Sequence, residues 1–399
     1  MKRILFLHPN FPGQFVRPAL QAAKQGNDVK FICHTHFGRK LSGVERVALK
    51  GPLSQNSLNE LGLKGNSKTL ALAKQFQSGM ELIKSQGWEP DLIVSHSGFG
   101  CGLHSNCVWP NAYKIAYVEW WFAANSILSK YDPNNTWWAG PSPSENESLR
   151  ERNLSIALEL IESELIVSPT EWQKNQLPLS LQQRCKILPD GVDTNRFRPN
   201  ANNKSHYPLI TYGTRGMEAM RGFPEFILEL PAILEKNKEV KIEIAGEDEI
   251  CYGGRAPEDG SYGKWAAKKL QKWIEEKRVV FVGRLSPTEY QRWLQRSWVH
   301  VHLTRPFVAS WSLLEAMASG CSIVATNTEP VQEFLKNEDC IFIDQRKPGW
   351  LIEPMNRLLE SEGEREKLGL NARRQSENWS EPKSFQLWDR ILIPRQSTD

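Results

Sequence analysis

The sequence predicts an α/β fold made of two doubly wound parallel-sheet domains in tandem. Short runs of β-branched and aromatic residues alternate with longer helix-like stretches along the chain, the pattern of parallel strands joined by crossover helices. The length of 399 residues is enough for two domains of ordinary size. A polar stretch at residues 200–205 separates two series of roughly six strands each and is typical of a linker.

The expected strands of the first half are short apolar runs that end at Pro, Gly or polar residues. The opening run ends at Pro9 after four apolar residues, which is too short for a signal peptide and favours a first strand. We expect strands at 3–8, 29–34, 91–96, 114–119, 164–168 and 186–188. We expect helices at 15–25, 66–87, 145–162 and 171–176.

The second half repeats the same alternation with longer helical stretches. Strands are expected at 209–212, 240–245, 279–282, 299–303, 322–325 and 341–343. Helices are expected at 223–235, 260–276, 287–297, 312–319, 330–336, 347–360 and 363–376. Ligands of such sheets bind where loops leave the carboxyl ends of the strands, so the cleft between the two domains is the expected site.

The composition excludes several classes of protein. A hydrophobic content of 40% with a net charge of +4 excludes a disordered chain. No apolar run approaches the ~20 residues of a membrane-spanning helix. The slightly basic first half is compatible with an acidic ligand, an anionic membrane surface or simply a solvated surface. No basic run with interleaved aromatic residues indicates nucleic-acid binding.

Cysteine and histidine usage indicates a reducing compartment and no structural metal. The 7 cysteines are scattered and form no Cys-x-x-Cys pair, which argues against a disulfide framework or a zinc knuckle. The pairs His34/His36 and His300/His302 have metal-ligand spacing, but neither has a third ligand nearby in the sequence.

Residues 120–140 are rich in aromatic side chains and end in a Gly-Pro-Ser-Pro sequence. The segment is too broken for one helix. It is either a packed insertion or an exposed rim for sugar stacking or membrane contact.

Two loops at expected strand ends carry residues suited to an anion. After the strand at 209–212, Arg215 and Arg221 stand on a glycine-bearing loop and could clamp a diphosphate with planar, permanently charged forks. The alternative is that Arg215 pairs with Glu218 and closes the loop. After the first strand, Gly13 lets backbone amides approach an anion near a helix N-terminus.

Two further loops complete the candidate site. After the strand at 299–303, Ser312 is a plausible N-cap, so backbone amides of residues 310–313 would face the cleft with the positive helix end. Glu315 would then lie in the first turn and grip two hydroxyls, or form a capping box with Ser312. The strand at 279–282 ends at Gly283, where backbone atoms could contact the edge of a base.

With these residues the sequence resembles the family-4 glycosyltransferases, which are retaining enzymes of the GT-B fold with two facing Rossmann-like domains. The resemblance spans nearly the whole chain and is carried by residues 188–197, Ala245-Gly246-Glu247 and the run Leu314-Glu315-Ala316-Met317-Ala318-Ser319-Gly320. The opening residues 8–15 resemble a bacterial subgroup of that family.

The resemblance implies a role for each candidate residue. Arg215 and Arg221 match the donor diphosphate clamp, with one extra residue between them. Glu315 matches the glutamate that holds the nucleotide ribose. The implied backbone contacts to the phosphates come from Ser310, Trp311, Ser312 and Leu313, and those to the base from Val282, Gly283 and Arg284. Gly13 and Gln14 would face the donor from the other domain.

Two positions depart from the family pattern. Phe307 stands eight residues before Glu315, where the family usually has a glutamate that touches the donor sugar. Glu119 stands where many relatives have a histidine. We hypothesise that Glu119 supplies the contact to the sugar from across the cleft.

The predicted organisation and function follow. We expect an N-terminal acceptor domain at 1–200, a nucleotide-sugar donor domain at 205–377, and a C-terminal helix within 378–399 that packs back onto the first domain. The predicted reaction is hexose transfer from a nucleotide diphosphate sugar to an acceptor hydroxyl, with retention and without a cofactor or metal. The expected location is cytoplasmic, with peripheral contact at the inner membrane face. The alternatives are a nucleotide-sugar epimerase, a sugar phosphorylase, or a non-catalytic nucleotide-sugar-binding subunit.

Overall fold

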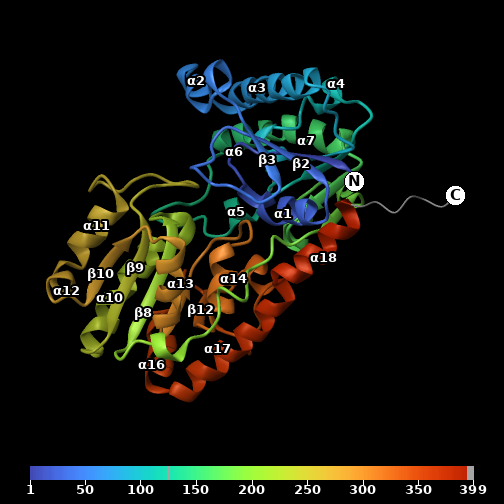
Figure 1. Ribbon diagram of the computed structural model, residues 1–399. Helices are drawn as coiled ribbons and strands as arrows, with labels where there is room; N and C mark the ends of the chain where they lie inside the picture. The colour runs from blue at the N-terminus through green and yellow to red at the C-terminus, as the bar shows by residue number, and fades with distance from the viewer. Residues whose placement is uncertain (124–125, 393–399) are drawn as a thin grey trace. The chain divides into compact units, whose positions relative to one another are not determined.

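The computed structural model describes residues 1–123 and 126–392, which fold into two compact units (Figure 1). Of the described residues, the first unit comprises 1–123, 144–191 and 381–392, and the second comprises 126–143 and 192–380. Each unit contains one parallel β-sheet with helices on its faces, which confirms the predicted pair of doubly wound α/β domains.

The sheet of the first unit has seven parallel strands in the order β3-β2-β1-β4-β5-β6-β7. The central strands are apolar on both faces, as expected for strands covered by helices. Their bounds are β1 Arg3–Leu7, β2 Asp28–Cys33, β3 Val44–Ala48, β4 Leu92–His96, β5 Tyr113–Tyr117, β6 Leu165–Ser168 and β7 Cys185–Ile187.

Helices cover both faces of this sheet. On one face α1 (Val16–Lys24) and α18 (Glu381–Leu392) pack around Phe6 and Phe31, and Arg17 of α1 forms an ion pair of 2.7 Å with Glu381. On the other face α3 (Gly65–Ser85) and α2 (Gln55–Glu60) pack against β1 and β2. The remaining helices are α4 Ser105–Val108, α6 Pro143–Glu151, α7 Asn153–Glu162, α8 Glu171–Lys174 and α9 Leu179–Gln182.

The sheet of the second unit has six parallel strands in the order β10-β9-β8-β11-β12-β13. β8 and β11 are therefore neighbours although two strands separate them in the sequence. The bounds are β8 Leu209–Gly216, β9 Lys241–Glu247, β10 Val279–Gly283, β11 Val299–His302, β12 Ser322–Thr326 and β13 Ile341–Ile343.

Two hydrophobic clusters hold helices to the two faces of this sheet. The larger joins α10, α11, α12 and α16 to one face, and the other joins α13 and α14 to the opposite face. The helix bounds are α10 Phe223–Lys236, α11 Tyr262–Lys269, α12 Gln271–Glu275, α13 Pro287–Arg296, α14 Trp311–Ala318, α15 Glu329–Gln332, α16 Ile352–Glu360 and α17 Glu362–Ser376. A further short helix of this unit, α5 (Ile127–Lys130), comes from the segment between β5 and α6.

The structure differs from the predicted elements in several places. The short helices α2, α4, α5 and α9 are additional, and β8 continues to Gly216 beyond the strand end predicted at 212. The strand β3 is absent from the predicted elements. Glu45 and Arg46 interrupt its apolar residues, and it pairs only with β2 at the edge of the sheet. The helix expected at 145–162 is divided into α6 and α7. The helix expected at 260–276 is divided into α11 and α12.

The domain boundaries also differ from the expected ones. Residues 192–200 belong to the second unit, where the Val192 amide donates to the Trp379 carbonyl (2.8 Å) and the Phe197 ring is buried. Of the expected C-terminal helix, the structure describes α18 up to Leu392, and residues 393–399 lie outside the described residues.

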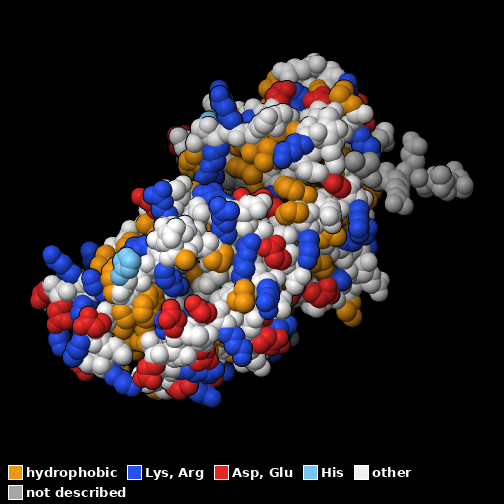
Figure 2. Space-filling view, turned by 60° about the horizontal axis from the view of Figure 1, so that its bottom comes forward, with side chains coloured by type: hydrophobic (Ala, Val, Ile, Leu, Met, Phe, Trp, Pro, Cys, Tyr) orange, Lys and Arg blue, Asp and Glu red, His pale blue; other side chains and the backbone are white. Residues whose placement is uncertain are grey.

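Charged side chains of both signs lie interspersed on the face of the molecule drawn in Figure 2. Within the described ranges, no helix has the length and apolarity to cross a lipid bilayer.

Candidate functional site

The loops that follow β8 and β11 lie at the point where the strand order of the second sheet reverses. The loops after two such neighbouring strands run in opposite directions, which leaves a crevice at the carboxyl edge of the sheet. Arg215 lies within β8, next to its last residue Gly216, because the strand continues beyond the end predicted at 212. Arg221 belongs to the loop after β8, and Thr304 and Phe307 belong to the loop after β11. The Arg305 amide donates to the Met220 carbonyl (3.0 Å) and joins the two loops.

Arg221 ends a 3-10 turn (Ala219–Arg221) and is held from two sides. Its Nη1 donates to the Thr304 hydroxyl over 2.9 Å, and its guanidinium lies over the Tyr252 ring at 5.0 Å from the centroid. Its carbonyl accepts a hydrogen bond from the Tyr212 hydroxyl (2.7 Å). Its polar and aromatic partners thus fix Arg221 at the switch point.

Tyr252 also joins the second predicted arginine to the site. Arg215 is exposed, and although burial acts in the opposite direction, the nearby Tyr252 hydroxyl raises the pKa of its guanidinium. The Phe307 ring packs edge-on against Tyr252 with 5.4 Å between centroids. Sequence reasoning missed Tyr252, although its place after β9 and beside two glycines was a usable signal.

Glu218 does not take the role that the alternative interpretation gave it. Instead of pairing with Arg215, its buried carboxylate accepts hydrogen bonds from the Cys251 and Tyr252 amides, each over 2.8 Å. Burial raises the pKa of this carboxyl. Glu218 therefore fixes the loop that carries Tyr252 and leaves Arg215 to the site.

The start of α14 corrects the predicted cap. The N-cap is Ser310, because the helix begins at Trp311, and Ser312 lies inside the first turn with its hydroxyl 2.7 Å from that of Ser310. The Leu313 and Leu314 amides donate to the Ser310 carbonyl, so Leu313 does not present a free amide to a ligand.

Glu315 consequently lies two residues deeper in the helix than predicted. It is the fifth residue of α14, so the capping box that Ser312 and Glu315 could have formed is absent. Its carboxylate lies close enough to Tyr290 to help raise the pKa of that hydroxyl, although burial is the larger cause. Tyr290 stacks on Trp293 of the same helix, α13.

The turn after β10 is open. Gly283 has φ of +68°, and no heavy atom lies within 4 Å of the position of an added Cβ. Arg284 is exposed and forms an ion pair of 3.6 Å with Glu247. Val282 packs in the same hydrophobic cluster as Leu313, so the structure brings this predicted turn and α14 together.

In the first unit, Gly13 and Gln14 lie beside His8 at the end of β1. The His8 Nδ1 accepts the Asn10 amide over 2.9 Å, so its Nε2 carries the proton and donates to Gln14 Oε1 over 2.8 Å. Burial, followed by the neighbouring His96, lowers the pKa of His8 to about 3. Gly13 has φ of +52°, and an added Cβ would lie 2.6 Å from the His8 ring.

Glu119 lies beside His96, which ends the neighbouring strand β4. The His96 Nε2 is 3.5 Å from Glu119 Oε2, and its Nδ1 accepts the Gly98 amide over 3.2 Å. The ring of Phe99 packs on both His8 and His96. Sequence reasoning singled out neither histidine for this site, although each lies at the carboxyl end of a strand.

The histidines and cysteines that were considered as metal ligands form no candidate metal site among the described residues. Nowhere in residues 1–123 and 126–392 do three His, Cys, Asp or Glu side chains come together in a group that could hold a metal ion. His300 and His302 are buried in β11, and burial lowers their pKa to about 4 and about 3. All seven cysteines are free thiols.

Aromatic residues in the described parts of the segment 120–140 pack on other elements, as in a packed insertion. Trp120 packs at a tilt on Trp172 in the first unit. Trp137 packs on Trp265 of α11 in the second unit, with 4.6 Å between ring centroids. Residues 124 and 125 lie outside the described residues.

Comparisons with known proteins match this arrangement. Residues 25–197 match the family model of the glycosyl transferase family 4 group, and residues 193–375 match that of glycosyl transferases group 1. No curated protein matches the sequence.

Solved structures share the fold at low sequence identity. Sucrose-phosphate synthase from Thermosynechococcus elongatus has a TM-score of 0.73 at 14% identity, with 98% of each chain covered. Anabaena HepE, solved with UDP-glucose, has a TM-score of 0.68 at 14% identity, with 98% of this chain and 99% of that chain covered. These likenesses show that the fold is GT-B.

Proposed function

The chain belongs to the family-4 glycosyltransferases, and from this premise we propose that it transfers a hexose from a nucleotide diphosphate sugar to an acceptor hydroxyl, with retention at the anomeric carbon. The observation that carries the donor proposal is the arginine pair at the switch point of the second sheet. Arg215 and Arg221 meet at Tyr252, and Arg221 is oriented by Thr304.

The proposed chemistry places charge where these arginines lie. Cleavage of the bond between the anomeric carbon and the phosphate oxygen leaves negative charge on the departing diphosphate. Two guanidinium groups that are already oriented stabilise this charge without reorganising, and the N-terminal end of α14 adds its dipole. We propose that these groups replace a metal ion.

The remaining steps of the proposed transfer need no separate base. The acceptor oxygen bonds to the anomeric carbon on the face that the diphosphate leaves, and the acceptor's proton passes to an oxygen of the leaving phosphate. Glu315 would hold the ribose, and the open turn at Gly283 would hold the base. The absence of side-chain atoms around Gly283 supports the latter assignment.

For Glu119 the proposal is a hydrogen bond from a sugar hydroxyl to its carboxylate. Its position beside His96 at the carboxyl edge of the first sheet supports this role. Glu119→Gln should lower turnover, and unchanged turnover would show that the carboxylate takes no part.

The donor's base is the first unknown to test. The solved structures of HepE hold UDP or UDP-glucose, which makes uridine nucleotides the first choice. A thermal-shift panel of uridine, guanosine, adenosine, cytidine and thymidine diphosphate sugars, applied to the wild type and to Arg215→Ala, should show stabilisation of the wild type by the true donor. Equal stabilisation of both proteins would contradict the clamp.

One observation favours a second candidate, a non-catalytic nucleotide-sugar-binding subunit. Phe307 packs against Tyr252 at the position where the family usually has a glutamate. A transferase releases nucleoside diphosphate only when an acceptor is added, whereas a binding subunit releases none under any condition. An epimerase would convert the donor sugar without an acceptor.

The proposed location is the cytoplasm. Seven free thiols support a reducing compartment. Peripheral contact with the inner membrane face stays a prediction from the slightly basic first half. Co-sedimentation with anionic lipid vesicles tests it, since only a membrane-binding protein should pellet with them.

A further inference from the structure

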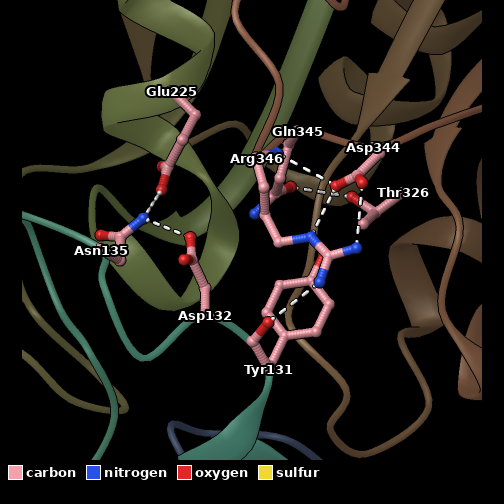
Figure 3. Close-up of polar contacts among 8 residues, drawn as sticks. All are labelled: Tyr131, Asp132, Asn135, Glu225, Thr326, Asp344, Gln345 and Arg346. Atoms are coloured by element: carbon pink, nitrogen blue, oxygen red, sulfur yellow. Dashed lines mark hydrogen bonds and ion pairs between the residues drawn. The ribbon is translucent and has the colours of Figure 1, made fainter.

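Residues 126–143, which we call the strap, lie in the first half of the sequence but belong to the second unit. The strap is fastened there by polar contacts (Figure 3). The Tyr131 carbonyl accepts a hydrogen bond from Arg346 Nη1 (3.1 Å), and Asn135 Nδ2 donates to Glu225 Oε1 (2.9 Å). Arg346 is itself paired with Asp344 at 2.7 Å.

Asn135 also sets the direction of the residues that follow it. Its Oδ1 accepts hydrogen bonds from the Trp137 and Trp138 amides, each over 3.0 Å. The two indole rings then diverge. Trp137 packs on Trp265 and Tyr262 of α11, while Trp138 turns toward the loops at the carboxyl edge of the sheet.

Trp138 contacts two of these loops. The Arg305 guanidinium lies over its ring, 5.0 Å from the centroid. The backbone of Gly253 and Gly254 also lies against Trp138, since a Cβ built on Gly253 would be 2.9 Å from the indole ring. Only glycine permits this approach, and Gly253 (φ +156°) and Gly254 (φ +95°) both have a positive φ.

Arg305 depends on this aromatic cover. It is fully buried, and neither its Nη1 nor its Nη2 has a hydrogen-bond partner among the described residues. Instead its guanidinium lies over the rings of Trp138 and, at 6.0 Å, Tyr131. Cation–π contact is strongest when the cation is shielded from water, as it is here.

Two residues that Trp138 contacts, Arg305 and Gly253, are each next in the sequence to a residue that holds the Arg221 guanidinium. Arg305 is bonded to Thr304, whose hydroxyl accepts from Arg221. Gly253 is bonded to Tyr252, whose ring lies under Arg221. Trp138 therefore contacts the residue next to Thr304 in one loop and the residue next to Tyr252 in the other, and these are the two groups that hold Arg221.

We propose that Trp138 is a positioning residue for the donor clamp: it holds the loops of Thr304 and Tyr252 at the spacing that aims the Arg221 guanidinium at the diphosphate. The role rests on the proposed function, because it presumes that Arg221 binds a diphosphate. A positioning role predicts loss of diphosphate affinity and not of nucleoside affinity, since the base turn at Gly283 has no described contact with the strap.

The experiment compares Trp138→Ala with Trp138→Phe and with Trp137→Ala in the full chain. Trp137 is the matched control, because it is a half-buried tryptophan of the same strap that packs on α11 and has no described contact with Arg305 or Gly253. Dissociation constants are measured by calorimetry for UDP and for uridine, and melting temperatures are recorded for each protein. If the wild type prefers another base, the matching nucleoside diphosphate and nucleoside replace them.

Trp138→Ala should weaken diphosphate binding about tenfold, the effect of about one well-oriented hydrogen bond to a charged group, and leave nucleoside binding unchanged. Trp138→Phe should restore most of the affinity, since its ring can still cover Arg305. Trp137→Ala should lower the melting temperature without changing the ratio of the dissociation constants for UDP and uridine.

Three results would overturn the role of Trp138. They are unchanged diphosphate binding by Trp138→Ala, equal weakening of diphosphate and nucleoside, and an equal effect of Trp137→Ala. If the wild type itself binds no nucleoside diphosphate, the donor site is refuted and the role of Trp138 falls with it. Should Trp138→Ala fail to fold, Trp138→Leu replaces it, because leucine fills part of the space but places no ring over Arg305. Weaker UDP binding with unchanged uridine binding in Trp138→Leu supports the role, and wild-type dissociation constants for both contradict it.

Discussion

Replacing Arg221 by alanine is the most direct test of the donor clamp. Its guanidinium donates to the Thr304 hydroxyl at 2.9 Å and lies over the Tyr252 ring at 5.0 Å, and both of these partners are neutral. Hydrogen bonds to a charged group contribute about 1.5–3 kcal/mol each. A guanidinium group that pairs with two phosphate oxygens should therefore contribute about 3 kcal/mol to the binding free energy, which corresponds to about 100-fold in the dissociation constant.

The variant should remain folded. It removes one hydrogen bond and one cation–π contact, which together cost about 1–2 kcal/mol of unfolding free energy. The Thr304 hydroxyl keeps its own donation to the Arg305 carbonyl (2.8 Å), so no buried hydroxyl is left without a partner. Arg221→Lys keeps the charge but loses the planar fork, and we expect an intermediate loss of about tenfold.

Isothermal titration with the preferred nucleoside diphosphate measures these losses at two ionic strengths. Arg292→Ala is the matched control, since it removes one exposed positive charge from α13 in the same unit. A wild-type dissociation constant for Arg221→Ala would refute the clamp. An equal loss in Arg292→Ala would show that general electrostatic attraction, and not a positioned group, explains the binding.

Three further predictions concern the same unit. Glu315→Gln should weaken nucleoside diphosphate binding about tenfold by removing a charged acceptor, and calorimetry that gives a wild-type constant would contradict the ribose contact. Gly246→Ala should destabilise the protein in urea unfolding by about 2 kcal/mol or more, because its Cβ would lie 2.3 Å from a carbonyl oxygen at φ of +141°. Gly283→Ala, in open space at φ of +68°, should cost about 1 kcal/mol, and equal losses would contradict the steric argument. Burial lowers the pKa of His300 to about 4, so the unfolded state binds the proton more readily and stability falls as the pH drops from about 6.5 toward 4. Between pH 7 and pH 5 the unfolding free energy of His300→Gln should fall by about 2 kcal/mol less than that of the wild type. An unchanged pH profile would show that this histidine does not cause the loss of stability.

Local sequence signals predict that several candidate residues lie at one edge of the second sheet. Gly283 ends a strand, and Arg221 and Glu315 belong to segments that follow strands, and the carboxyl ends of parallel strands meet at one edge. The helix start was placed two residues late, since Ser310 and Ser312 are both acceptable caps and the backbone conformation of Ser310 decides between them.

Long-range contacts decided what the sequence left open. Tyr252 belongs to the site because Glu218 binds its amide from another loop, and no local pattern shows that bond. The edge strand β3 forms because β2 offers it a partner, although Glu45 and Arg46 interrupt its apolar residues.

By itself the sequence determined the two-domain α/β architecture, the family and the segment that carries both arginines, since these follow from periodicity, turn residues and short motifs. Only the tertiary structure decided that residues 126–143 pack with a unit whose other residues begin at position 192. The physical reason is that the place of this segment depends on the surface that receives the Trp138 indole, which consists of the Arg305 guanidinium and the Gly253 backbone. That surface exists only after distant segments have packed.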